Sequence, residues 1–301
     1  MRLPRTLAAC ATALLASLAA LPAAHAERLA SGPHILATPD YQARSGRVPP
    51  AEGTAAATML YYGGTVFTHV KVVSVMWGST VNPTTVAGVP GFSAALVNST
   101  YLDQTAEYDT LHKGVNGRKP TKQHIHRGSY LGQVQITPHN TSKSLQDVDV
   151  QNELMYQISQ GVLPPQDLNT LYMVYFPVDV SIELDGILSC RDFGAYHFAV
   201  SDLKPTRTNL FYAVEPDCHS SWSSITFAAS HEFIEATTDN IPTPGTQPAF
   251  PQTWNTSDGY EVADLCGGSG TLTGGGKSYT VSQYFLNSTN RCSTTATYTS
   301  P

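Results

Sequence analysis

The chain has 301 residues, of which 41% are hydrophobic and 13% charged, and its formal net charge at pH 7 is −6. An acidic chain of this kind is a poor binder of nucleic acid, because phosphate contacts need clustered Lys and Arg side chains. A chain of this length can bury a complete hydrophobic core, as one large domain or as two small ones.

The first 26 residues have the pattern of a secretory signal peptide. Arg2 and Arg5 form a short basic region, and an apolar run of Ala and Leu extends from Leu7 to Leu21. Residues 24–26 read Ala-His-Ala, which fits the A-x-A cleavage pattern, so we expect the mature chain to begin at Glu27 with a net charge of −8. No later stretch is long and apolar enough to span a bilayer. We therefore expect a secreted or periplasmic monomer that neither inserts into membranes nor binds nucleic acid.

Four cysteines remain after the predicted cleavage: Cys190, Cys218, Cys266 and Cys292. In an oxidising compartment the simplest pairing is sequential, Cys190 with Cys218 and Cys266 with Cys292, although the sequence permits three connectivities. No C-x-x-C motif occurs, so a zinc site built from cysteines is not indicated. Sequential disulfides would brace the segments just before and just after residues 231–239.

The mature chain begins with residues 27–57, which contain four prolines and show no periodicity. We interpret them as an irregular N-terminal arm, either a short pro-segment or an extended arm packed on the domain. Residues 58–301 are predicted to form a single domain. In it, His69–Trp77 is β-branched and apolar, which predicts a buried strand. Residues 90–110 are predicted to be a helix.

The middle of the chain continues with a polar loop over residues 111–127 and a strand over residues 129–137. Residues 144–160 predict an amphipathic helix, with Ser142 or Ser144 as its N-cap and Gly161 as its end.

The second half of the chain begins with a predicted strand over residues 171–184, bent at Pro177. Further strands are predicted at 195–200 and 209–214, and a helix at 225–238 with its N-cap within residues 220–224. A proline-rich loop and a glycine-rich stretch then precede a last strand at 279–286. Strands that alternate with helices favour the α/β class, with a mixed β-sheet and helices packed on it.

The helix at 225–238 carries an H-E-x-x-E motif. His231 and Glu235 are four residues apart, so they lie on one side of the helix, about 6 Å apart along its axis, where they can share a metal ion. Glu232 occupies the place of the general base in H-E-x-x-H metallopeptidases, although here Glu235 stands where those enzymes have the second His. The motif therefore predicts a metal site with two protein ligands.

A catalytic zinc site needs a third protein ligand and one open position. The best source is the segment that contains Glu261 and Asp264. In gluzincin peptidases a later Glu completes the site, so by analogy we assign Glu261 as the third ligand. Asp264 or Asp239 would then orient His231. Two carboxylate ligands weaken the Lewis acidity of a metal, so Ca²⁺ or Mn²⁺ is the alternative to Zn²⁺.

The chemistry expected from this site is hydrolysis of a peptide or protein substrate. A bound Zn²⁺ would lower the pKa of water towards ~7 and polarise the substrate carbonyl. Glu232 would take the proton from water and pass it to the leaving amine. His197 or Tyr260 would stabilise the oxyanion. The competing interpretation is that His231, Glu232 and Glu235 solvate an exposed helix face and bind no metal.

Short blocks along the chain resemble a known family. Trp77-Gly78 follows a buried strand, residues 171–175 (LYMVY) lead to Cys190 and to residues 194–197 (GAYH), and residues 210–214 (LFYAV) precede Cys218. This order is similar to that of the phosphate-induced, EXORDIUM-like extracellular proteins of plants. The resemblance spans roughly residues 70–292.

The H-E-x-x-E motif departs from the plant pattern, so the plant role in cell-wall growth signalling does not transfer to this chain. The chain is more similar to bacterial secreted relatives in which H-E-x-x-E-A-x-T-D is followed by E-x-x-D-x-C and which are regarded as metallopeptidase-like. The resemblance implies a zinc-dependent peptidase or, alternatively, a non-catalytic extracellular binding protein with a structural metal. A hydrolase of another bond, such as an amide in cell-wall peptides, is a further alternative.

Overall fold

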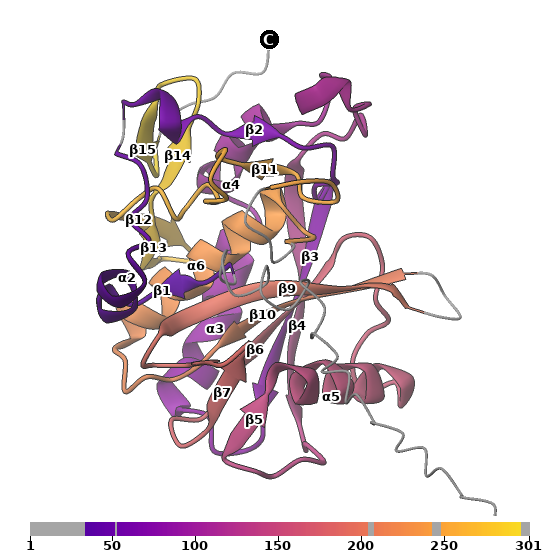
Figure 1. Ribbon diagram of the computed structural model, residues 1–301. Helices are drawn as coiled ribbons and strands as arrows, with labels where there is room; N and C mark the ends of the chain where they lie inside the picture. The colour runs from indigo at the N-terminus through magenta and orange to yellow at the C-terminus, as the bar shows by residue number, and fades with distance from the viewer. Residues whose placement is uncertain (1–33, 52, 204–207, 243–247, 296–301) are drawn as a thin grey trace, which may run out of the picture.

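The computed structural model describes residues 34–51, 53–203, 208–242 and 248–295 (Figure 1). The predicted signal peptide, residues 1–26, lies outside these ranges. Within them, no helix combines the length and apolar character that crossing a membrane requires.

A mixed six-stranded sheet forms the centre of the molecule, in the order β1-β9-β10-β6-β3-β4. Strands β3, β4, β6 and β10 run parallel to one another, whereas β9 is antiparallel to β10 and β1 is antiparallel to β9. The predicted α/β class is therefore confirmed. The strands are β1 (Leu36–Ala37), β3 (His69–Trp77), β4 (His126–Ile136), β6 (Thr170–Tyr175), β9 (Phe193–Leu203) and β10 (Thr208–Glu215).

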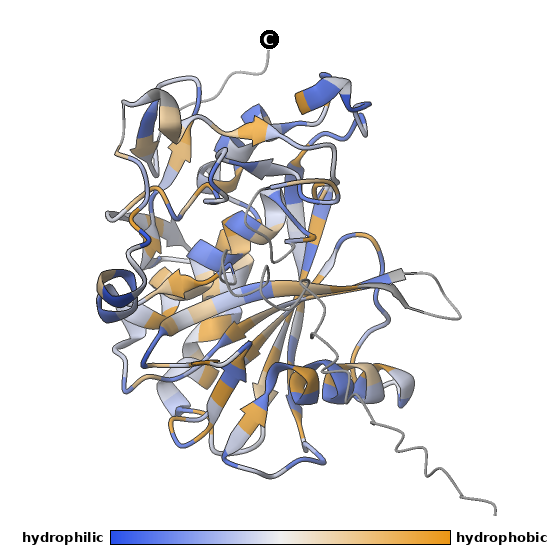
Figure 2. Ribbon diagram, viewed as in Figure 1, coloured by the Kyte–Doolittle hydropathy of each residue, from blue (hydrophilic) through white to orange (hydrophobic). Residues whose placement is uncertain are grey.

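Apolar side chains pack on both faces of this sheet. In Figure 2 the strands in its middle are coloured mainly as hydrophobic. Every residue of β6 is buried, and β3 is buried from Val72 to its end. A parallel strand that is covered on both faces needs such a continuous apolar run, because neither face meets water. The prediction of a buried strand at His69–Trp77 is confirmed with the same bounds.

The two faces of the sheet carry two separate cores. Helices α3 (Pro83–Leu96) and α6 (Trp222–Thr238) cover one face, where Phe92, Phe211 and Phe233 pack together. Helix α5 (Asp147–Ser159) covers the other face, and its Leu154 packs in a core with Tyr172. Figure 1 shows α3 and α6 on one side of the sheet and α5 on the other.

Among the described residues, three small strand pairs flank the α6 side of the central sheet, and a small three-stranded sheet lies on the α5 side. Ser282 of β13 donates its backbone N–H to Ser230 Oγ of α6 at 2.9 Å, which fixes one hairpin against the helix. The remaining strands are β2 (Leu60–Tyr61), β5 (Ser144–Gln146), β7 (Ser181–Leu184), β8 (Ile187–Leu188), β11 (Trp254–Asn255), β12 (Ser269–Gly274), β13 (Lys277–Ser282), β14 (Tyr284–Leu286) and β15 (Arg291–Ser293). They pair as β2 with β11, β12 with β13, β14 with β15, and β5 with β7 and β8.

Both disulfides follow the sequential pairing. Cys190 is bonded to Cys218 with a Cα–Cα distance of 5.2 Å, and Cys266 to Cys292 with a Cα–Cα distance of 5.8 Å. The first bond joins the segment before β9 to the segment after β10. The second joins β15 to the segment that follows Asp264.

The helix predicted at residues 90–110 was wrong at both ends. Helix α3 begins at Pro83, because the Asn82 side chain accepts a hydrogen bond from Thr84 N and Pro83 suits the first helical position. Pro90 lies inside the helix. After Leu96 the chain forms two short pieces instead, α4 (Thr100–Asp103) and a 3₁₀ helix (Gln104–Tyr108).

The strand predicted at residues 171–184 was also wrong, because β6 and β7 belong to different sheets. The helix expected from Ser144 begins at Asp147, since Gln146 caps it together with Asp149 and residues 144–146 form β5. Gly161 adopts φ 70° and ends this helix as predicted.

The C-terminal region differs from the prediction in a similar way. The glycine-rich stretch forms most of the β12–β13 hairpin, and the single strand expected at 279–286 is divided between β13 and β14. Gln283 lies between these two strands, and its N–H donates to Gly268 O at 3.0 Å.

The N-terminal arm contains regular structure that its sequence did not predict. Strand β1 pairs with β9, with Leu36 opposite Ala195. Helix α2 (Pro39–Ser45) follows, because Thr38 accepts a hydrogen bond from Tyr41 N and Gly46 closes the helix with φ 69°. Seven residues are too few for periodicity to reveal the helix.

Candidate metal centre

Helix α6 carries the H-E-x-x-E motif into the interior. Ser221 caps the helix by accepting from Ser224 N, as predicted for a cap within residues 220–224. Every residue from Ala229 to Thr238 is buried, and Glu232 and Glu235 have no exposed surface. The interpretation that these side chains solvate an exposed helix face is therefore wrong. Buried charged groups need a partner that offsets their lost hydration.

The first cluster of potential metal ligands joins α6 to the turn that contains Asp264. His231 Nε2 lies 3.2 Å from Glu235 Oε1 and 3.7 Å from Asp264 Oδ1. One ligand atom from each of the three residues lies within 4.8 Å of the other two. Glu235 Oε1 also accepts hydrogen bonds from Ala263 N at 3.2 Å and Asp264 N at 2.9 Å. These two bonds hold the turn against the helix and fix the position of Asp264.

The second cluster joins α6 to β9. His197 Nδ1 lies 3.1 Å from Glu232 Oε2, and His197 Nε2 lies 3.1 Å from the backbone oxygen of Asp239. His197, Glu232 and Glu235 also place one ligand atom each within 4.8 Å of one another. Glu235 therefore belongs to both clusters, and the two clusters form one continuous centre.

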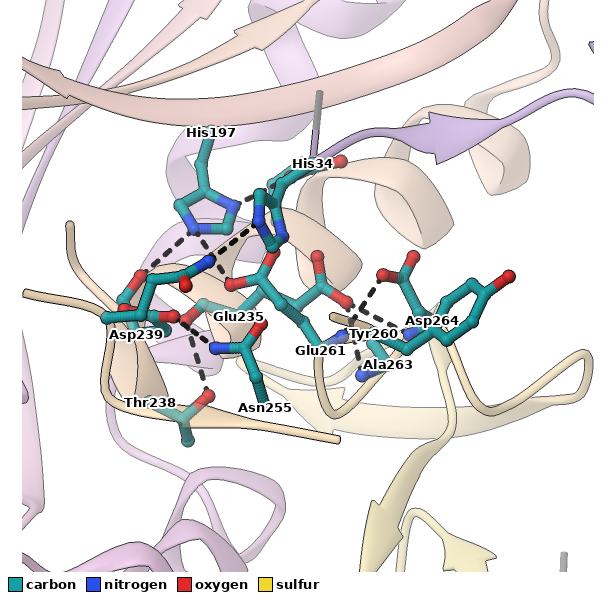
Figure 3. A network of polar contacts seen from close by, with 12 residues as sticks. His34, His197, Glu235, Thr238, Asp239, Asn255, Tyr260, Glu261, Ala263 and Asp264 are labelled. Carbon is teal, nitrogen blue, oxygen red and sulfur yellow. Dashed lines mark hydrogen bonds and ion pairs between the residues drawn. The ribbon is translucent and has the colours of Figure 1, made fainter. Parts of the chain in front are cut away.

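Glu261 lies at the edge of this centre, between two imidazoles. Its Oε2 is 3.0 Å from His34 Nδ1 and its Oε1 is 3.5 Å from His197 Nε2. Figure 3 shows His34 and His197 side by side above the carboxylates. Glu261 N also donates to Asp264 Oδ2 at 3.1 Å. His231 is thus in contact with Glu235 and Asp264. Glu261 instead contacts His34 and His197.

Asp239 closes the end of α6 and holds the neighbouring loop. Its Oδ1 accepts from Thr253 N at 3.0 Å, and its Oδ2 accepts from Asn255 Nδ2 at 2.5 Å (Figure 3). Burial raises the pKa of Asp239 to about 6, although His34 and Asn255 oppose that rise. Its carboxylate therefore faces Thr253 and Asn255, while its backbone oxygen faces His197.

Several polar atoms of the centre are buried without a hydrogen bond to any described residue. They are Glu232 Oε1, Glu235 Oε2, both Glu261 carboxylate oxygens and both ring nitrogens of His231. Buried polar atoms are almost always paired, and an unpaired one costs free energy. Imidazole nitrogen and carboxylate oxygen are both good ligands of divalent metals. The donor atoms therefore fit a divalent cation.

The charges of the centre shift the pKa values of its histidines. Burial lowers the pKa of His197, but the carboxylates of Glu261 and Glu232 outweigh this effect and raise it to about 10. For His231, burial is likewise outweighed by Glu235 and Asp264, which raise its pKa well above the usual value. Without a metal, the centre therefore takes up protons to balance its carboxylates.

Two buried residues near the centre were missed by the sequence analysis. The Glu215 carboxylate ends β10, forms no hydrogen bond to a described residue, and has its pKa raised strongly by burial and by Glu232. Its position directly after an apolar strand was the available signal, because side chains gather at the carboxyl ends of parallel strands. The other residue is His34, for which the sequence offered no signal.

Comparison of the chain with protein-family models, with curated proteins and with solved structures found no match. The resemblance to the EXORDIUM-like family therefore remains a prediction. All seven predicted site residues lie in or beside the centre: His197, His231, Glu232, Glu235, Asp239, Glu261 and Asp264.

Proposed function

We propose that this protein is a secreted, divalent-metal-dependent hydrolase of peptide bonds. The observation that carries the proposal is the group formed by His231, Glu235 and Asp264, whose ligand atoms lie within 4.8 Å of one another in a buried centre. Two disulfides and the lack of a membrane-spanning helix among the described residues are compatible with secretion.

The spacing of these ligands suits a small cation. Metal–ligand distances near 2.0–2.1 Å in a tetrahedral zinc site place ligand atoms about 3.3 Å apart. The separations of 3.2 Å and 3.7 Å from His231 Nε2 are close to that value. A donor set with two carboxylates also suits Mn²⁺ or Ca²⁺, so the proposal names Zn²⁺ first and these two as alternatives. In this assignment Asp264 is the third ligand, and Glu261 lies beside the site.

The Glu232 carboxylate supports hydrolysis because one of its oxygens is positioned by a hydrogen bond and the other is available to accept a proton. Oε2 is hydrogen-bonded to His197 Nδ1 at 3.1 Å, whereas Oε1 forms no hydrogen bond to a described residue. A bound zinc ion would supply Lewis acidity and lower the pKa of water. Glu232 Oε1 would accept the proton from water and return it to the leaving amine. His197 would fix the orientation of Glu232.

A second candidate function is a non-catalytic extracellular binding protein with a structural metal. The observation in its favour is the depth of the centre, since the side chains of His231 and Glu235 are only 2% and 1% exposed and that of Asp264 is 17% exposed. Structural metal sites are closed, whereas catalytic sites keep an open position. This candidate predicts a metal that raises the melting temperature while the protein hydrolyses no peptide.

The experiment that separates the two candidates combines metal analysis with an assay on casein. The proposal expects one equivalent of divalent metal per chain, hydrolysis that chelator abolishes, and recovery when Zn²⁺ is restored. Metal-dependent melting without hydrolysis, also after the N-terminal arm has been detached, would favour the structural role. A metal-free protein whose stability is unchanged by chelator would contradict both candidates.

A further inference from the structure

The N-terminal arm, here residues 34–51, lies directly over the centre. Strand β1 forms one edge of the central sheet and pairs with β9, with Leu36 opposite Ala195. Two residues before Leu36, His34 lies beside His197 (Figure 3). Both imidazoles contact Glu261, at 3.0 Å and 3.5 Å. The arm therefore contributes the His34 side chain to the centre.

The arm is held mainly by polar and backbone contacts. Thr38 donates its N–H to Asp192 O and its hydroxyl to Arg191 O, both at 2.9 Å. Arg44 forms an ion pair with Asp192, and the Arg47 guanidinium lies over the Tyr260 ring, 5.3 Å from its centroid. Such contacts at a surface contribute little individually to stability.

The arm makes few apolar contacts, and none of its helical residues is fully buried. Helix α2 has no buried residue and is hydrophilic along its length in Figure 2. The arm contains no cysteine, so no disulfide ties it to the domain. Its apolar contacts are those of Ile35, which is buried in the core on the α5 side of the sheet, and of Ala37 and Tyr41, which pack partly buried against the same core. The arm is therefore held to the domain by these contacts and by its polar ones, without a covalent cross-link.

A small cavity separates the arm from the turn beneath it. It is lined by His34 and Arg47 from the arm and by Gly259, Tyr260 and Asp264 from the turn. The cavity reaches Asp264, which is also a proposed metal ligand. The boundary between the arm and the centre is therefore not closely packed, and it leads to the proposed metal.

We propose that the arm occupies the binding site for an extended polypeptide, which pairs with the edge of β9 in the place of β1. Addition of a peptide strand to a sheet edge is a common mode of recognition, in which backbone hydrogen bonds supply affinity and side-chain pockets supply specificity. The buried Glu261 carboxylate lies where His34 enters, so the site prefers a His or a basic side chain at that position. The proposal deepens the proposed function by giving the substrate its class and its binding edge, and it rests on that function for the chemistry.

The intact chain keeps this site filled. A tethered segment acts at an effective concentration on the order of millimolar, so a free peptide of moderate affinity does not displace it. The segment after α2 is open to a protease, since the Val48 side chain is 73% exposed. A cut in this segment leaves the arm bound only by its non-covalent contacts.

The test uses the full chain with a specific protease sequence inserted between Val48 and Pro49, cut after folding. The probe is a fluorescent peptide with the sequence of residues 34–48, and its binding is followed by anisotropy. The cut protein is expected to bind the probe at least tenfold more tightly than the uncut protein. A probe with His34→Ala is expected to bind about tenfold more weakly than the parent probe, whereas a probe with Ser45→Ala binds like the parent.

An arm that stays bound after the cut would block the probe. A second cut protein therefore carries Arg44→Ala in its own arm, which removes the ion pair with Asp192. Weakening of the arm is expected to speed its exchange with the probe. If neither cut protein binds the probe while both keep a cooperative melting transition, the proposal is overturned.

Probe binding and casein hydrolysis are both measured with Zn²⁺ and with chelator. If the probe binds but casein is not hydrolysed in either condition, the proposed peptidase activity is wrong and the peptide-binding edge is supported. If casein is hydrolysed but the probe does not bind, the peptidase activity is supported and the peptide-binding edge is wrong.

Discussion

His197 Nδ1 lies 3.1 Å from Glu232 Oε2, and this contact joins the sheet to helix α6 inside the protein. His197 belongs to β9 and Glu232 to the H-E-x-x-E motif, so the pair links two elements that are separated in the sequence by β10. Neither side chain has more than 1% of its surface exposed. Because the pair is buried, its geometry is fixed before any ligand arrives, which is what a positioned base requires.

Replacement of Glu232 by Gln tests its role as the general base. The amide keeps the shape of the side chain but takes up no proton, so we expect hydrolysis to fall by about 10²–10⁴-fold with metal content unchanged. The measurement is the rate of peptide hydrolysis by protein whose metal content has been verified. Glu183→Gln, on β7 outside the centre, is the matched control and should leave the rate unchanged. A Glu232→Gln protein that remains active would show that another group takes the proton.

Glu215 predicts a pH dependence of stability. Burial raises its pKa, so the folded state binds this proton more tightly than the unfolded state does. The stability that it contributes is present below the unfolded pKa near 4.5 and is lost as the pH rises towards the folded value, at about 1.4 kcal/mol for each pKa unit of difference. Glu215→Gln should therefore stabilise the protein at pH 8 relative to wild type, and much less at pH 4. Equal urea midpoints for the two proteins at both pH values would contradict the assignment.

The two disulfides are expected to differ in their effect on the affinity of the centre for a metal ion. Replacement of either pair by Ser should lower the free energy of unfolding by about 2–4 kcal/mol, because each closes a loop of similar length in the unfolded chain. Only Cys266 lies close in sequence to Asp264, so loss of the Cys266–Cys292 bond should also weaken metal affinity. Loss of the Cys190–Cys218 bond serves as the control. Equal metal affinity in both variants would show that this disulfide does not brace the site.

Asp239 is expected to act through the loop that it holds. Its carboxylate accepts hydrogen bonds from Thr253 N and Asn255 Nδ2, both buried. Asp239→Ala leaves these donors without their acceptor, which costs about 1–3 kcal/mol for each buried group. We therefore expect a lower melting temperature with and without metal. Asp258→Ala, at an exposed position, is the control for a lost carboxylate. A fall seen only in the metal-bound protein would instead indicate that Asp239 is a ligand.

Local patterns predicted much of the helix and its motif. Ser221 caps α6 within the predicted range, and the four-residue spacing of His231 and Glu235 places them on one face, because both features depend only on neighbouring residues. Strand β3 was predicted with its bounds for the same reason, since six of its nine residues are apolar and four of these are Val.

Contacts between distant segments were not predictable in the same way. Glu261 and Asp264 were correctly placed near the centre, but only the folded turn shows that Asp264 faces His231 and that Glu261 faces His34 and His197. His34 lies in an arm without periodicity, so nothing local indicates that it reaches β9. The pairing of β1 with β9 is a tertiary contact and has no counterpart in local sequence.

Titration of purified, metal-free protein with Zn²⁺ tests the central claim most directly. The account predicts one tight equivalent per chain, bound by wild type and by Glu232→Gln and lost in His231→Ala and in Glu235→Gln. His112→Ala, at an exposed position, should bind like wild type. If wild-type protein binds no Zn²⁺, Mn²⁺ or Ca²⁺, or if His231→Ala and Glu235→Gln bind Zn²⁺ as tightly as wild type, the buried centre is not a metal site and the account is wrong.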